Sequence, residues 1–573
     1  MTVPIIRKRA KRPKTRTGCL TCRQRRIKCD EQKPSCGNSR RSRRYCEPSG
    51  SLLHSARETP IHDVILAPIT PMPANGSLRS VDIVGLEFFY AWTIKKLPES
   101  SSWQHIAVDL AAQKPFLAFG CAALGSMHRV LIAPNERGDG HSMVDHRDLA
   151  IQQYTAAMSH ARRYISSLPA IVREDEIVVA LMLSLLLFYF ALYAGNRLEA
   201  SAHLKSALEM LYERRSCPSN GLACEGRRTV CLKVRPANGV DTLLNTFIRM
   251  DQDFDVSDQA DPYLHPLCDE PLPKSFFSLE EANVHLDVLA TKVESLKECI
   301  VDAAYLAKRL ASDTSDELEY YNDESDDNTE MDVAGQVRYC LLRALARTSN
   351  LKLEPELVEE MEATRLDLSA WSAAFAAVRF STETEVEYML TQLYLFYTWF
   401  VACTWQDSTE MMCDRFDQQF AHMADIVERV AQAGLVPLTG TSKPQTLPAM
   451  SLGSGFVSCL RLIIIKCRVL SIRQRCLAVL RTINLQDIDY LAAHLERVIE
   501  IENERAGIYL DQSDDRRLPE HARLLEVAML SEPRNELASS SGILSTRMAP
   551  TRMVYCVREP SLDGRVRAYT DSF

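Results

Sequence analysis

Five cysteines within residues 19–46 constrain this chain more than any other feature of its 573 residues. Their stretch reads CLTCRQRRIKCDEQKPSCGNSRRSRRYC, with the spacing Cys19-x2-Cys22-x6-Cys29-x6-Cys36-x2-Ser39-x6-Cys46. Two cysteines separated by two residues can present both thiolates to one metal ion, so this spacing is a strong signal for zinc. Ser39 occupies the position at which a further cysteine would repeat the spacing of Cys19, Cys22 and Cys29. The stretch therefore predicts a small module, residues 18–47, that is organised by metal.

With its neighbours RRIKCDEQKPSC, this module resembles the fungal binuclear zinc cluster, the Zn(II)2Cys6 class of DNA-binding domains. Six thiolates can hold two tetrahedral Zn2+ ions only if two of them bridge, and in the family these are the first and fourth cysteines. The resemblance implies a complete first site, whose ligands are Cys19, Cys22, Cys29 and Cys36. It implies a second site made of the bridging Cys19 and Cys36 together with Cys46 and Ser39.

Ser39 is a poor replacement for a cysteine ligand. Its hydroxyl ionises far less readily than a thiol and lacks the soft sulfur that zinc prefers. Oxygen ligands do bind zinc, so three alternatives stay open: Ser39 is a weak ligand, a water replaces it, or the position has no ligand. Structural zinc supplies about 10–16 kcal/mol of folding free energy in small fingers. We therefore expect two Zn2+ ions, as in the family, with the second site weakened.

Basic side chains are concentrated in the same module. RQRRIK follows Cys22 and predicts a short helix, which the resemblance places in the major groove of double-stranded DNA. Arg25 and Arg26 align with the family's groove-contacting positions, and bidentate Arg contacts with guanine suit the family's CGG-like triplets. Each remaining basic residue could alone be a solvated surface charge, but as a set they are expected to contact phosphates: Arg23, Lys28, Arg40, Arg41, Arg43 and Arg44.

The net charge is divided unequally along the chain. Residues 1–50 hold 16 Lys and Arg against three acidic residues, a net charge of +13, whereas the remainder carries −21. A basic head on an acidic body is typical of proteins that bind a polyanion with one part. Residues 1–17 form a basic arm without an apolar signal region, so we expect a nuclear localisation signal, a phosphate-tracking arm, or both. The residues expected to direct import into the nucleus are Lys8, Arg9, Lys11, Arg12 and Lys14.

The rest of the chain predicts a mostly α-helical protein. Apolar residues recur every three or four positions in VDIVGLEFFYAWTIKKL, HRDLAIQQYTAAMSHARRYISSL, NRLEASAHLKSALEMLYERR and TEVEYMLTQLYLFYTWFVACTW. Strand alternation is scarce. We expect a Pro-rich linker at residues 48–79 and a large all-α body at residues 80–530, followed by a poorly ordered tail at residues 531–573.

Three stretches of the body need separate interpretation. Residues 177–195, IVVALMLSLLLFYFALYAG, are long and apolar enough to cross a bilayer, but charged and amphipathic neighbours favour a buried core helix and no membrane. Residues 313–332 hold ten acidic side chains and predict a disordered loop, either a solvated linker or an activation segment. IKCR, residues 465–468, is interpreted as helix surface with one core cysteine.

The helical body also resembles the regulatory domain that follows the zinc cluster in many fungal transcription factors. The likeness is carried by AIQQYTAAMSHARRYI, GNRLEASAHLKSALEML, FFSLEEANVHLDVL and IIIKCRVLSIRQRCLAVL. The resemblance implies a sequence-specific transcription factor that regulates RNA polymerase II genes in the nucleus, with transcriptional coregulators as further partners. A homodimer is left open, although prolines in the linker leave no room for a coiled coil.

Two other classes of function are weighed against this one. A regulator whose DNA binding is impaired or lost through Ser39, and which acts as an interaction protein through its body, is the alternative. An enzyme has little support, because the sequence contains no G-x-x-x-x-G-K-[ST], G-x-S-x-G or H-E-x-x-H motif.

Overall fold

The computed structural model divides the chain into two compact units, residues 1–70 and 71–573. The structure describes Asn38 and Arg41 in the first unit and, in the second, residues 79–97, 100–132, 142–167, 173–218, 226–254, 262–268, 270–311, 337, 340–345, 353–378, 385–404, 409–435, 456–483, 488–507, 518–537, 544–559 and 565–572. The predicted basic arm, the linker up to residue 78 and the acidic loop at residues 313–332 therefore lie outside the described residues.

The prediction of a mostly α-helical protein is confirmed, and the described parts of the four periodic stretches are helical apart from single residues at their ends. The helices of the first half are α3 (Ser80–Phe88), the π-helical η1 (Phe89–Thr93), η2 (Ile94–Lys96), α4 (Ser100–Gln113), α5 (Pro115–Ile132), α6 (Ser142–Ser166), α7 (Glu174–Tyr193), α8 (Arg197–Arg215), α9 (Gly239–Phe254) and α10 (Leu279–Ala311). Those of the second half are α12 (Pro355–Ala376), α13 (Glu385–Thr404), η5 (Glu410–Phe416), α14 (Asp417–Val430), η6 (Ala431–Leu435), α15 (Phe456–Lys466), α16 (Leu470–Leu480), α17 (Ile488–Ala506) and η8 (Glu520–Ala522).

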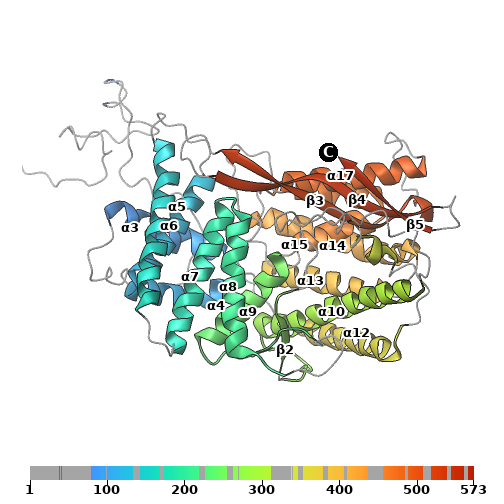
Figure 1. Ribbon diagram of the computed structural model, residues 1–573, viewed down its shortest axis with the longest axis horizontal. Helices are drawn as coiled ribbons and strands as arrows, with labels where there is room; N and C mark the ends of the chain where they lie inside the picture. The colour runs from blue at the N-terminus through green and yellow to red at the C-terminus, as the bar shows by residue number, and fades with distance from the viewer. Residues whose placement is uncertain are drawn as a thin grey trace, which may run out of the picture. The chain divides into compact units, whose positions relative to one another are not determined.

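Helix α7 is the centre of the first bundle. It packs against α4, α5, α8 and α9, and its side chains from Leu185 to Ala191 are all buried (Figure 1). Among the described residues this is the helix that is long and apolar enough to cross a membrane, with a mean hydropathy of 2.2, yet 72% of that apolar window is buried inside the protein. A helix surrounded by neighbours has no polar face to keep. The prediction of a buried core helix is confirmed.

A glycine sets the sharp turn that follows α7. Gly195 has φ of 78°, a conformation that costs glycine little and other residues more. Its N–H donates to the carbonyl of Leu192, and the next N–H, that of Asn196, donates to Ala191 at 2.8 Å, which closes the end of α7. The Asn196 side chain then accepts from the Glu199 N–H at 3.2 Å and caps the start of α8. The turn therefore lays α8 back along α7.

Two glycines allow α3 and α5 to cross at close range. A Cβ atom placed on Gly125 would lie 2.1 Å from the Gly85 carbonyl oxygen. A Cβ on Gly85 would in turn lie 2.6 Å from the carbonyl oxygen of Ala122. Both distances are too short for real contacts, so the two backbones meet only because neither position carries a side chain.

The second half of the body is a stack of helices. α12 packs on α10, α10 on α13, and α13 on α14 and α15, while α17 packs on α15 (Figure 1). Trp371 on α12 is fully buried, its ring stacks on Phe375 and its indole N–H donates to the Ala282 carbonyl on α10 at 2.9 Å. A separate core joins α13 to α16 around Phe400, Phe420 and Ile463.

Five strands correct the expectation that the body is all-α and the tail poorly ordered. Within the body, β1 (Thr229–Leu232) pairs in parallel with β2 (His265–Cys268). At the end of the chain, β3 (Leu524–Leu537), β4 (Leu544–Glu559) and β5 (Arg565–Ser572) form an antiparallel sheet in which β4 is central. β1 and β2, at four residues each, are too short to show alternation.

Burial on both faces explains why the sequence pattern does not predict β4. Met553 and Val557 pack with Val498 and Ile501 of α17 on one face. Val554 and Cys556 pack on the other face. A strand that is covered on both sides reads as a continuous apolar run, here MVYCV, without the period of two that marks a half-exposed strand.

Candidate functional site

The predicted zinc and DNA-contacting residues lie outside the described residues, with one exception. Arg41, expected to contact a phosphate, has helical backbone and an exposed side chain, and Asn38 one turn earlier is also helical. An exposed guanidinium is accessible to an anion. The five cysteines, Ser39 and the other basic residues of the predicted site stay predictions from the sequence.

The described part of the chain offers no competing metal centre. Within it, no three His, Cys, Asp or Glu side chains are grouped so that they could hold a metal ion. In the sequence, the residues suited to bind a metal ion are those of the cysteine module. Four thiols there suit one zinc ion, whereas the ligand set expected for the second ion contains the hydroxyl of Ser39 in place of a thiol.

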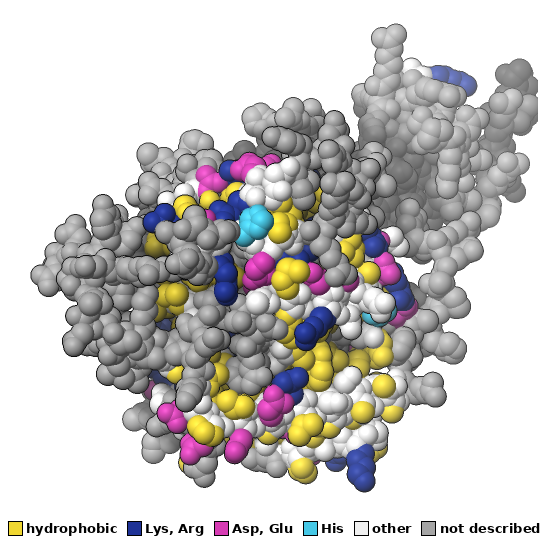
Figure 2. Space-filling model, turned by 90° about the vertical axis from the view of Figure 1, so that its right-hand side faces the viewer, with side chains coloured by type: hydrophobic (Ala, Val, Ile, Leu, Met, Phe, Trp, Pro, Cys, Tyr) yellow, Lys and Arg dark blue, Asp and Glu magenta, His cyan; other side chains and the backbone are white. Residues whose placement is uncertain are grey.

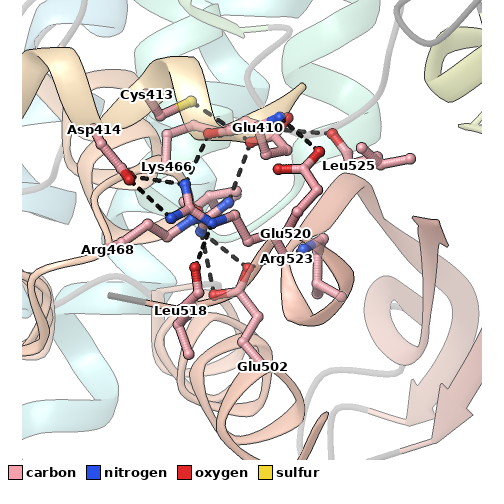
Figure 3. A network of polar contacts seen from close by, with 12 residues as sticks. Glu410, Cys413, Asp414, Lys466, Arg468, Glu502, Leu518, Glu520, Arg523 and Leu525 are labelled. Atoms are coloured by element: carbon pink, nitrogen blue, oxygen red, sulfur yellow. Dashed lines mark hydrogen bonds and ion pairs between the residues drawn. The ribbon is translucent and has the colours of Figure 1, made fainter. Parts of the chain in front are cut away.

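The structure describes a buried network of charges in the second half of the body (Figure 3). Glu410 of η5 accepts from Lys466 Nζ at 3.0 Å and from Arg468 Nη2 at 3.1 Å. Nearby, Arg523 donates to both carboxylate oxygens of Asp414, at 2.8 and 2.9 Å. We call these residues, together with Arg473 and Glu502, the buried charge network.

Glu502 on α17 collects three donors and is itself fully buried. Arg468 Nη1 lies 2.9 Å from its Oε1, and Arg473 donates from Nη1 to its Oε2 at 2.7 Å. The Leu524 N–H, the first of β3, also donates to Oε1 at 2.9 Å. The two oxygens are thus satisfied by two guanidinium groups and a backbone amide, and the sheet is tied to α17 at the point where it begins.

The charges of the network are set by burial and by their partners. Burial by itself lowers the pKa of Arg468, but the carboxylates of Glu502 and Glu410 raise it above its ordinary value. For Arg473 burial dominates, and its pKa is lowered despite Glu502. Ionic groups in such a site depend on one another, because each removed partner leaves an uncompensated charge in a medium of low polarity.

The network corrects the interpretation of IKCR as helix surface. Lys466 keeps only 12% of its side chain exposed and Arg468 only 1%, while Cys467 is buried as expected. The signal in the sequence is the three positive charges Lys466, Arg468 and Arg473 within the largely apolar run IIIKCRVLSIR. Charges inside an apolar run are found buried when they are paired, and the partner Glu410 lies 56 residues earlier, out of reach of local pattern analysis.

A second polar group joins the helices of the first bundle. The Tyr154 hydroxyl on α6 lies 2.5 Å from Glu199 Oε1 and 3.0 Å from His203 Nε2, both on α8, and the Tyr154 ring stacks on Phe190 of α7. Burial, aided by Glu199, raises the pKa of Tyr154 well above its usual range, and burial lowers the pKa of His203. A hydroxyl that stays protonated at neutral pH is a hydrogen-bond donor, so this group links three helices.

Charges of both signs are mixed on the described surface of the body that Figure 2 shows. On the face shown in Figure 2, the described acidic and basic side chains are interspersed with hydrophobic ones. Among the described residues on that face, the side chains do not form a stripe of a single sign of charge, which is the mark of a nucleic-acid surface. In the sequence, positive charge is concentrated in residues 1–50, which hold 16 Lys and Arg against three acidic residues.

Two parts of the chain match known domain families. Residues 17–53 match the fungal Zn(2)-Cys(6) binuclear cluster domain, and residues 88–251 match the fungal specific transcription factor domain. The second match covers the bundle around α7. No solved structure matches the chain.

The similar curated proteins are fungal regulators of transcription. The chain is 26% identical over 224 residues, 35% of each protein, to an aspercryptin biosynthesis cluster-specific transcription regulator of Emericella nidulans. It is 48% identical over 68 residues to an uncharacterized transcriptional regulatory protein of Schizosaccharomyces pombe, which is 11% of this chain and 12% of that protein. It is 60% identical over 42 residues to white-opaque regulator 2 of Candida albicans, 7% of this chain and 9% of that protein.

The chain thus spans about a third of the length of the first of these relatives and a smaller share of the other two. The two domain matches nevertheless occur in the order that the sequence predicted, cluster first and helical domain second. In these two regions the chain is thus similar to fungal transcription regulators, with a Zn(2)-Cys(6) binuclear cluster domain followed by a fungal specific transcription factor domain.

Proposed function

We propose that this protein is a sequence-specific DNA-binding transcription factor of RNA polymerase II genes, which reads CGG-like triplets with the helix that follows Cys22. The observation that carries the proposal is the array of five cysteines around RQRRIK, within the matched cluster domain. Arg25 and Arg26 are assigned to base edges, where a guanidinium can contact guanine O6 and N7 together.

Zinc is the cofactor that the donor set fits. Cys19, Cys22, Cys29 and Cys36 supply four thiolates to the first ion, and Cys46 adds a fifth for the second. Zinc supplies folding free energy to such a module when it is bound, because the unfolded chain has no preformed site. The protein's own contribution is to hold the basic helix in a fixed orientation, so that less free energy is lost in ordering it on DNA.

We assign a role to the basic arm from its charge and a role to the helical body from its similarity to the fungal specific transcription factor domain. The basic residues between Lys8 and Lys14 are proposed to direct nuclear import. The helical body is proposed to contact transcriptional coregulators. We assign no catalysed reaction to the body, because the matched domain and the similar curated protein are those of transcription regulators.

A mobility-shift experiment with the full chain tests the proposal. Arg26→Ala should cost about 1–3 kcal/mol of binding to a CGG-containing duplex and should relax specificity at one base position. Arg43→Ala is the matched control, since a phosphate contact weakens all duplexes alike and lowers the salt dependence. An equal effect of Arg26→Ala on every duplex would remove Arg26 from base recognition.

Ser39 favours a second candidate function. If the second zinc site does not form, DNA binding is impaired and the protein acts through its helical body as an interaction protein. The same mobility-shift experiment, carried out with and without added Zn2+, separates the two functions. Failure to bind any CGG-containing duplex at saturating Zn2+, in protein whose body is folded by circular dichroism, would favour the second function over the first.

A further inference from the structure

Two cysteines far apart in the sequence meet in the second half of the body. The sulfur atoms of Cys340 and Cys556 lie 3.7 Å apart, although 216 residues separate them. Cys340 is on the helical segment at residues 340–345, and Cys556 is on β4, the central strand of the sheet. Both side chains are fully buried.

The surroundings of the two sulfurs are closed and apolar. Ala344 and Val337 on the helical side meet Val554 on the sheet side, and Val566 and Ala568 of β5 pack against the same cluster. An ion pair lies close by, in which Arg343 Nε is 3.3 Å from Glu526 of β3. The helical segment is therefore held on the sheet by apolar packing around the sulfurs and by at least one ionic contact.

Geometry places the two thiols one small movement from a covalent bond. A disulfide has a sulfur–sulfur distance of about 2.05 Å, so the atoms must approach by about 1.7 Å, a movement within the range of side-chain rotation. The hydrogen bond to Cys556, together with burial, raises the pKa of the Cys340 thiol well above its ordinary value. Since the thiolate is the reactive form, the raised pKa and the burial of the pair make its oxidation slow.

We propose that Cys340 and Cys556 form an oxidation-dependent latch, a disulfide that fixes the helical segment at residues 340–345 to the C-terminal sheet. The oxidant is a peroxide. The thiol of one cysteine attacks the peroxide oxygen and becomes a sulfenic acid as water or an alcohol leaves. The sulfur of the other thiol then displaces hydroxide from the sulfenic acid, and its proton leaves with that hydroxide as water.

Overall, two thiols and one peroxide react to give one disulfide and two hydroxylic products, and two electrons pass from sulfur to oxygen. A dithiol reductant returns the pair to thiols. This latch concerns the body alone and does not depend on the proposed DNA binding. It closes a loop of the chain between Cys340 and Cys556, which are 216 residues apart, so that the helical segment and β4 could then not separate.

Mapping of disulfides in the full-length zinc-loaded protein tests the proposal. The protein is treated with hydrogen peroxide, remaining thiols are alkylated, and peptides are analysed without reduction. We expect a peptide pair that joins Cys340 to Cys556, formed in at least tenfold higher yield than in protein unfolded by guanidinium. The wild-type chain alone decides the question, so no variant that misfolds can obscure it.

Two variants sharpen the result. Cys340→Ala should abolish the linked pair, whereas Cys459→Ala, at a fully buried cysteine of α15 in a different core, should leave it intact. The proposal is overturned if the folded protein oxidises at other cysteines without joining Cys340 to Cys556. It is equally overturned if the link forms no more readily in folded than in unfolded protein, because proximity in the fold is then irrelevant.

Discussion

Replacing Glu502 with Gln tests whether the buried charge network stabilises the body. The substitution keeps the size of the side chain and removes its negative charge. Arg473 would then face a neutral amide at the position of its 2.7 Å partner, and Arg468 would keep Glu410 alone of its two carboxylates. The Leu524 N–H would compete with two guanidinium groups for a single carbonyl oxygen.

The expected cost follows from the burial of these groups. Breaking a buried ion pair by removing one partner typically costs about 3–5 kcal/mol, because the remaining charge is left uncompensated. Glu502 and both arginines are almost completely buried, so solvent cannot replace the lost carboxylate. Domains are stable by only about 5–15 kcal/mol, so Glu502→Gln should remove a large share of the stability of this half of the body.

Urea denaturation of the full chain, followed by tryptophan fluorescence and circular dichroism, measures the effect. At an m-value of about 3 kcal/mol/M, the expected loss lowers the midpoint by about 1 M or more. Glu496→Gln is the matched control: it lies on the same helix, is 46% exposed and pairs with Arg481, so it should cost about 0–1 kcal/mol. Equal midpoints for the two variants would refute the reasoning, because burial would then make no difference to the cost of losing a charge.

Three other predictions concern separate parts of the molecule. Gly125→Ala should destabilise the first bundle by about 1–3 kcal/mol in the same denaturation assay, whereas Gly120→Ala, whose Cβ would meet only Leu186 at 3.4 Å, should be tolerated; equal costs would contradict the close crossing. Burial, with a further contribution from Arg461, lowers the pKa of His494 to about 3, so its stabilising effect is complete above pH 6.5 and is lost as the pH falls. Relative to His494→Gln, the wild type should lose about 2 kcal/mol between pH 7.5 and pH 5, and parallel pH profiles of the two proteins would contradict this. Ser39→Cys should convert one tight and one weak zinc site into two tight ones, as metal analysis during a chelator titration will show, unless two equally tight ions are already present in the wild type.

Local patterns predicted the helices because the information that defines them is local. The apolar periodicity of residues 384–405 and the all-round apolar character of residues 177–195 were sufficient to identify α13 and the core helix α7. The sequence does not predict the C-terminal sheet because β4 is covered on both faces and so lacks alternation. Whether such a run is a strand depends on what covers it, here α17, which the run itself does not record.

The zinc cluster and the buried charge network differ in how far apart their residues lie in the sequence. A zinc cluster has its ligands within 28 residues, so its spacing is visible in the sequence, and the matched cluster domain covers residues 17–53. The buried charge network draws its acidic groups from residues 410–414 and 502 and its basic groups from residues 466–473 and 523. Long-range pairing of this kind becomes visible only when the helices are packed.

The contact between Glu502 and the first amide of β3 bears on the order in which the protein can finish folding during its synthesis. Helices from η5 to α17 leave the ribosome before residues 518–525 do. Until then Glu502 lacks the Leu524 N–H, Asp414 lacks Arg523, and Lys466 lacks the carbonyl of Leu525. A nascent chain halted at residue 510 would thus carry a helical stack with carboxylates and an ammonium group short of their partners. A frameshift or stop codon at that position should produce a substrate for the cell's degradation machinery, although every helix from α3 to α17 has already been translated.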